Sequence, residues 1–172
     1  MPLETMQDLL IDQLQDIFNA EQQLTKALPK LAERATDEDL TQAFRDHLAE
    51  TERQIQRLER VFQKLEQRPN NKVCKGMEGL IAEGSELLEQ EGNDAVIDAA
   101  LIAAAQRVEH YEVSAYGSAK AMAALLGHGD IVKLLDESQE EETAADKKLS
   151  LIATTVVNAR AAGTDPSMAA KV

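Results

Sequence analysis

The chain has 172 residues, of which 44% are hydrophobic and 28% are charged, as is usual for a single soluble globular domain. With 8 Gly, 4 Pro and only 3% aromatic residues, the composition argues against a β-sandwich or β-barrel. The 31 acidic residues outnumber the 18 basic residues, and the net charge of −13 disfavours binding to nucleic acid or to an anionic membrane surface.

The start of the chain, MPLETMQDLLIDQLQ, contains acidic residues and no basic side chain before Lys26, which is unlike a secretory signal or a transit peptide. No apolar run approaches the ~18 residues that a membrane span needs. The single cysteine, Cys74, has no partner for an intrachain disulfide. We therefore expect a cytoplasmic protein.

The first predicted helix covers about residues 6–35, because apolar residues recur there at alternating steps of four and three. Thr5 and Asp8 are predicted to form an N-cap pair. Pro29 is expected to kink or loosen the last turn. The positions that share the inward face are Leu10, Leu14, Ile17, Glu21, Leu24, Leu28 and Leu31.

The second predicted helix begins at Thr36 as the N-cap, because the acids at 37–39 suit a first helical turn, and it stops before Pro69. A weaker, short amphipathic helix is predicted within 74–91. The inward face of the second helix carries Leu40, Phe44, His47, Thr51, Gln54, Leu58, Val61 and Leu65.

A third long helix is predicted over about 95–126, a tight turn over 127–130, and a fourth long helix over about 131–161. Residues 163–172 look like a frayed tail, so one domain is expected over 1–162. Short connections join the first helix to the second and the third to the fourth, whereas the second and third are separated by a long connection. This pattern predicts an all-α four-helix bundle of ferritin-like topology, with one long crossover that contains a short extra helix.

Polar residues interrupt the apolar face of the first two helices near the middle. Glu21 stands alone between Ile17 and Leu24, where a carboxylate in a local salt bridge is the ordinary alternative to a metal ligand. On the second helix His47 and Glu50 are three residues apart, so they project the same way and can share one cation.

The third and fourth helices show the same feature. Glu109 and Glu112 are three residues apart on one face, and Glu142 and Asp146 are four apart and bracketed by apolar positions. Glu141 is the competitor of Glu142 for the inward position. His110 projects between two apolar faces of the third helix, so it competes with His47 for the role of imidazole ligand.

Unpaired charge in a buried face costs several kcal/mol, and bound cations would remove that cost. About six carboxylates and one imidazole suit a cage for two ions of Fe or Mn, with Zn less favoured. The alternative is a metal-free helical structural or interaction protein, in which Arg107 and Lys120 are candidate partners for the buried acids.

Five segments of the chain are characteristic: AEQQLTKALPKL (20–31), AFRDHLAETERQIQRLERVF (43–62), CKGMEGLIAEG (74–84), DAALIAAAQRVEHYEVSAYGSAKAMA (98–123) and EEETAADKKL (140–149). With these segments the chain resembles the bacterial YciF-type ferritin-like stress proteins, a family of largely unassigned function. The resemblance covers about residues 3–160. It implies a ferritin-like bundle, usually dimeric, with a dinuclear metal site between the helices, and induction under stress.

The general ferritin-like di-iron pattern has one Glu on the first and third helices and Glu-x-x-His on the second and fourth. Here position 53 is Arg and position 145 is Ala, so His47 has to supply the imidazole and Asp146 is the nearest substitute on the fourth helix. The chain thus has one imidazole where the general pattern has two. The expected ligands are Glu21, His47, Glu50, Glu109, Glu112, Glu142 and Asp146. We expect a homodimeric metal protein, with iron oxidation and peroxide handling as candidate reactions, and whether it is an enzyme stays open.

Overall fold

A computed structural model describes residues 2–165, and every regular element in that range is helical, which confirms the predicted all-α class. None of these helices is long and apolar enough to cross a membrane. The elements are α1 (Met6–Arg34), α2 (Glu38–Lys64), α3 (Lys75–Glu86), α4 (Asp94–Leu125), α5 (Gly129–Ile152), a π-helical segment (Ala153–Val157) and α6 (Asn158–Ala161).

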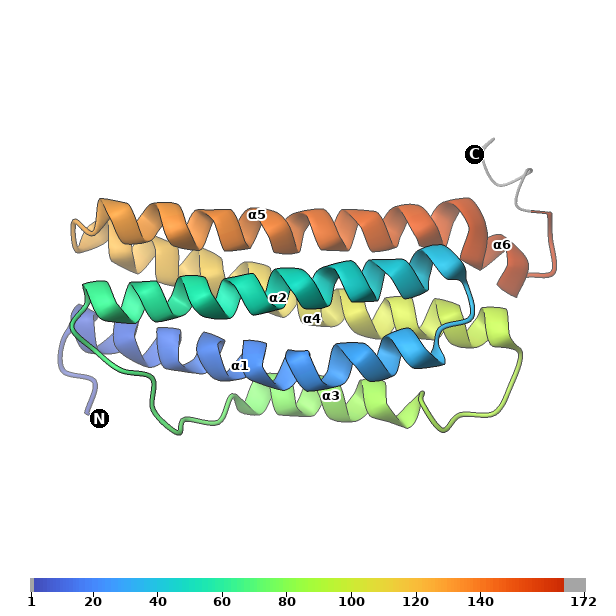
Figure 1. Ribbon diagram of the computed structural model, residues 1–172, viewed down its shortest axis with the longest axis horizontal. Coiled ribbons are helices and arrows are strands. Elements are labelled where there is room, and N and C mark those ends of the chain that lie inside the picture. Colours follow the sequence, from blue (N-terminus) through green and yellow to red (C-terminus); the bar gives the residue numbers. More distant parts are fainter. Residues whose placement is uncertain (1, 166–172) are drawn as a thin grey trace.

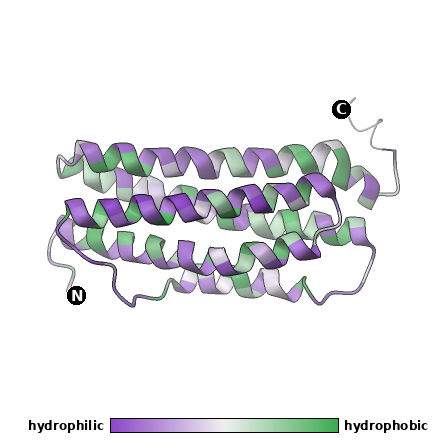
Figure 2. Ribbon diagram, viewed as in Figure 1, coloured by the Kyte–Doolittle hydropathy of each residue, from purple (hydrophilic) through white to green (hydrophobic). Residues whose placement is uncertain are grey.

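Four long helices lie side by side and form an elongated bundle (Figure 1). Helices α1 and α2 form one hairpin, and α4 and α5 form the other. The connection from α2 to α4 runs along the length of the bundle and carries α3, which lies against α1 and α4 (Figure 1). This is the predicted ferritin-like topology with one long crossover. The outward face of α2 is mostly hydrophilic (Figure 2), as expected for a helix that buries only one side.

The N-terminal caps follow the predicted chemistry at α1 and depart from it at α2. The amide of Asp8 donates to the Thr5 hydroxyl over 3.1 Å and the amide of Thr5 donates to the Asp8 carboxylate over 2.9 Å, which is a capping box. The N-cap of α2 is Asp37, whose carboxylate accepts from the Leu40 amide, so the assignment to Thr36 was wrong. The Thr36 hydroxyl is engaged elsewhere, because it donates to buried Asp98 over 2.7 Å.

The helix ends agree with the predicted ranges except in the fourth long helix. Helix α1 continues past Pro29 to Arg34, and the Ala35 amide closes its last turn by donating to the Leu31 carbonyl. Helix α2 ends at Lys64 because Glu66 adopts a left-handed backbone conformation (φ 53°). The short helix covers only Lys75–Glu86. The fourth long helix was predicted to be continuous to residue 161, but a π-helical segment interrupts it. Of the predicted tail, residues 166–172 lie outside the described range.

The hydrophobic core is divided into two clusters that occupy the two halves of the bundle. One cluster contains Leu24, Phe44 and Leu149, and the other contains Ile17, Leu58 and Leu135. On each long helix the residues between these clusters include buried polar side chains. The bundle therefore has a polar layer at mid-height, enclosed by apolar packing on both sides.

Candidate metal centre

The polar layer is assembled from all four long helices. Its members are at most 5% exposed, so water reaches them poorly. Each occupies the inward face of its helix, where the heptad-like spacing would otherwise place an apolar residue. They are Glu21 on α1, His47, Thr51 and Gln54 on α2, Glu109 and Glu112 on α4, and Ser138 and Glu142 on α5.

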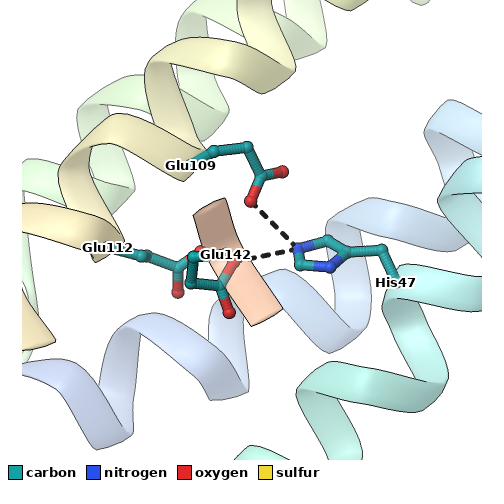
Figure 3. A group of neighbouring side chains, drawn as sticks. All are labelled: His47, Glu109, Glu112 and Glu142. Atoms are coloured by element: carbon teal, nitrogen blue, oxygen red, sulfur yellow. Dashed lines mark ion pairs between the residues drawn. The ribbon is translucent and has the colours of Figure 1, made fainter. Parts of the chain in front are cut away.

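Four of these side chains converge on one point (Figure 3). His47, Glu109, Glu112 and Glu142 each offer one ligand atom, and these atoms all lie within 4.8 Å of one another. The Nε2 atom of His47 lies 3.3 Å from a Glu109 oxygen and 3.5 Å from a Glu142 oxygen. These contacts have ion-pair distances without hydrogen-bond geometry. One imidazole and three carboxylates are a ligand set that suits Fe or Mn.

Glu21 completes the layer from α1. Its side chain is fully buried, and one carboxylate oxygen accepts a hydrogen bond from the Tyr116 hydroxyl of α4. The other oxygen has no hydrogen-bond partner. Tyr116 thus fixes the orientation of Glu21 while leaving one oxygen available.

A chain of polar contacts holds Glu142 from the side of α2. The Gln54 amide nitrogen donates to a Glu142 oxygen and also to Glu141 over 3.1 Å. Glu141 is held in turn by Arg57, whose two terminal nitrogens lie 2.9 and 3.1 Å from its carboxylate. Arg57 therefore neutralises Glu141, the less buried of the two adjacent acids, and leaves Glu142 without an arginine or lysine partner.

Eight buried side-chain atoms of the described structure have no hydrogen-bond partner, and all eight lie in this layer. An unsatisfied buried donor or acceptor costs ~1–3 kcal/mol, and a charged group costs more. Groups left in this state in a native protein require a partner such as water or an ion. The atoms are Glu21 Oε2, His47 Nε2, Thr51 Oγ1, Gln54 Oε1, Glu109 Oε2, both carboxylate oxygens of Glu112, and Glu142 Oε2.

The protonation of these groups is strongly shifted. Burial raises the pKa of Glu21 to about 8, and burial together with neighbouring carboxylates raises the pKa of Glu112 and Glu142 well above the usual range. Burial by itself lowers the pKa of His47, but the charge of Glu109 and the contact with Glu50 outweigh it and hold the pKa well above 6.5. Without a bound metal ion, these raised pKa values therefore favour the protonated forms of the buried groups at neutral pH.

The remaining predicted site residues lie farther out. Glu50 touches the His47 Nδ1 atom at 3.4 Å, and its side chain is 33% exposed. Asp146 lies outside the converging group and accepts a hydrogen bond of 2.8 Å from Gln106. His110 is exposed at the surface, with its ring 3.4 Å from Asp146.

The basic residues considered as partners for the buried acids are engaged elsewhere. Arg107 pairs with Glu83 at the surface, and Lys120 pairs with Asp136. Sequence reasoning had placed Gln54 and Thr51 on the inward face but gave them no role. Thr51 lies one helical turn and Gln54 two turns after His47, and this spacing was the available signal.

A cavity of about 220 Å³ opens beside the converging group. His47, Glu50 and Glu109 line it on one side, and Ala145 lines it on α5, where a larger residue would fill the space. At its rim Lys148 lies 2.7 Å from Asp46.

A family model described as "Domain of unknown function (DUF892)" matches residues 5–162 of this chain. Protein YciF of Escherichia coli (strain K12) is 46% identical over 165 residues, covering 94% of this chain and 98% of that protein.

Solved structures agree with the fold. The crystal structure of the E. coli stress protein YciF matches with a TM-score of 0.87 at 46% identity, covering 90% of this chain and 98% of that one. YcfI from Rhodopseudomonas palustris matches with a TM-score of 0.84 at 49% identity, covering 86% and 94%. A protein from Xanthomonas campestris pv. campestris is only 15% identical and shares the fold, with a TM-score of 0.73.

Proposed function

The chain belongs to the DUF892 family, the family of the E. coli stress protein YciF, and we propose that its polar layer binds a pair of Fe or Mn ions. The observation that carries the proposal is the set of eight unpartnered buried atoms, seven of them oxygens, between the four helices. No lysine or arginine of the described residues neutralises Glu21, Glu109, Glu112 or Glu142 through an ion pair. Bound metal cations would neutralise these four carboxylates.

The proposed ligands are Glu21, His47, Glu50, Glu109, Glu112 and Glu142. Glu112 would offer both of its carboxylate oxygens as ligand atoms, because both are buried and unpartnered. Glu50 contacts His47 from a partly exposed position and would complete the set. Asp146 stays outside it, because its carboxylate is held by Gln106.

Such a metal pair would supply redox chemistry, for which oxidation of Fe(II) and reduction of peroxide are the two candidate reactions. The residues around it have separate tasks. Tyr116 orients Glu21 and Gln54 orients Glu142, in the way that outer hydrogen bonds hold metal ligands. The cavity beside His47 admits a small molecule to the layer. The description of the E. coli relative as a stress protein supports a role of this chain in the response to stress.

Titration of chelator-treated protein with Fe(II) under anaerobic conditions, or with Mn(II), tests this proposal. We expect about two ions bound per chain. His47→Ala should weaken binding by ~10–100-fold or more. His128→Ala is the matched control, because His128 precedes α5 in the turn and contacts Gln7, and it should bind like the wild type.

The outcomes are distinct. If His110→Ala lowers metal binding while His47→Ala does not, the ligand set is wrong. If the wild type binds neither metal, the alternative of a metal-free structural protein is favoured.

We also propose a homodimer, for which sedimentation should give the mass of two chains at micromolar concentration.

A further inference from the structure

A second cavity, of about 230 Å³, lies where α3 packs across α1 and α4. It shares no lining residue with the four converging side chains of the candidate metal centre. Its walls are apolar and come from three helices: Leu24 and Leu31 of α1, Leu80 and Ile81 of α3, and Val108 of α4. The crossover helix therefore does not close completely over the bundle.

Small residues keep this space open. Ala27 and Ala104 line it from α1 and α4, and Gly84 lines it from α3. A Cβ atom at Gly84 would lie 3.9 Å from the Ala104 side chain, so larger residues at these positions would fill the cavity. Because a cavity of about 150 Å³ lined by aliphatic and aromatic residues binds benzene, this one is large enough for a short apolar chain or a single ring.

The rim of the cavity is basic, although the whole chain carries a net charge of −13. Lys26 and Lys30 lie one turn apart on α1, and both are exposed. Neither forms an ion pair with any other described residue. The other polar lining residues, Gln23 and Ser85, already donate hydrogen bonds within the protein. The two ammonium groups are therefore the donors left for a ligand.

We propose that this cavity binds a small amphipathic carboxylate, with its apolar body between α1, α3 and α4 and its carboxylate at Lys26 and Lys30. The site is separate from the proposed metal centre and does not depend on it. A two-fold copy of the chain centred on this groove would bring four lysines together, which opposes a second copy as the occupant. A purely apolar partner would leave both ammonium groups without a counter-charge.

Calorimetric titration with octanoate, below the concentration at which it forms micelles, tests the proposal. We expect one octanoate bound per chain. The double variant Lys26→Met/Lys30→Met should weaken octanoate binding about 10-fold or more, which is the effect of losing one charge-assisted interaction. The neutral analogue 1-octanol should bind this variant within about twofold of the wild type, because the apolar walls are unchanged.

The matched control is Lys133→Met/Lys147→Met, which removes the same charge from exposed positions on α5 and should leave octanoate binding unchanged. Ala27→Phe should abolish binding of both probes by filling the cavity from a half-buried position. If this variant fails to fold, the lysine variants still decide, because both lysines are exposed.

Three results would overturn the proposal. They are no octanoate binding by the wild type, unchanged binding by the Lys26/Lys30 variant, and retained binding by a folded Ala27→Phe. If octanoate does not bind and Ala27→Phe converts a dimer into a monomer in sedimentation, a second copy covers the groove.

Discussion

Replacing Glu21 with Gln should change the pH dependence of stability in a way that depends on the metal. In the metal-free protein, burial raises the pKa of Glu21 from 4.5 to about 8. Between these values the folded state keeps a proton that the unfolded chain has lost. The free energy of unfolding therefore falls as pH rises, by about 1.4 kcal/mol per pH unit for this one group. The Gln side chain does not titrate, so the unfolding free energy of Glu21→Gln lacks this decrease with pH.

From pH 5 to pH 7, the difference in unfolding free energy between Glu21→Gln and the wild type should shift by about 2.5 kcal/mol in favour of the variant. Urea denaturation of chelator-treated samples at several pH values measures it. The substituted amide would retain an acceptor oxygen for the Tyr116 hydroxyl. The other titratable groups that face this position are unchanged in the variant: His47 on α2, Glu109 and Glu112 on α4, and Glu141 and Glu142 on α5.

The exposed Glu33, also on α1, provides the control, because Glu33→Gln removes the same charge without touching the polar layer. With metal bound the sign reverses: Glu21→Gln removes a proposed ligand and should lower the melting temperature relative to the loaded wild type. Parallel pH profiles for Glu21→Gln and the wild type would refute the view that Glu21 is a buried, proton-holding carboxylate.

Two substitutions and one matched control test contacts outside the polar layer by urea denaturation. Gly76→Ala should destabilise the protein by about 1–3 kcal/mol, because the new Cβ would lie 2.7 Å from the Tyr111 ring. Gly79→Ala on the same helix is the control. Its Cβ would meet nothing within 4 Å, so this substitution should stabilise the protein by up to ~1 kcal/mol. An unchanged stability of Gly76→Ala would contradict the close contact. Asp98→Ala should cost about 3 kcal/mol or more, because Asp98 accepts hydrogen bonds from the Thr36 amide and hydroxyl and from the Asp37 amide. A loss below ~1 kcal/mol would show that water replaces Asp98.

Local chemistry was sufficient to predict the helices and their order. The four apolar faces, the short loops and the Thr5–Asp8 capping box depend on residues close together in the chain. The N-cap of α2 was not predictable in this way, because the Thr36 hydroxyl is drawn to Asp98, 62 residues away in the sequence. The π-helical segment after α5, which packs against α4, was not predicted either, because the apolar spacing runs on through it.

The candidate site likewise has some features that local spacing predicts and others that depend on contacts between helices. Spacing alone predicted that polar groups occupy the inward face of every long helix, and the structure places Glu21, His47, Glu112 and Glu142 there. Spacing could not determine which of these meet. Asp146 lies only one turn from Glu142, yet the rotation of about 40° over four residues directs it to Gln106. Spacing also could not predict the partners of Arg107 and Lys120. These long side chains pair with acids at the surface rather than with the buried carboxylates.

The central claim is that the polar layer holds two metal ions, and anomalous diffraction tests it most directly. Crystals of protein loaded with Mn(II) would be measured on both sides of the Mn absorption edge. We predict two anomalous peaks per chain among the six proposed ligands, Glu21, His47, Glu50, Glu109, Glu112 and Glu142. Crystals of fully loaded protein with no peak between the four helices, or with peaks only at surface carboxylates, would contradict the account.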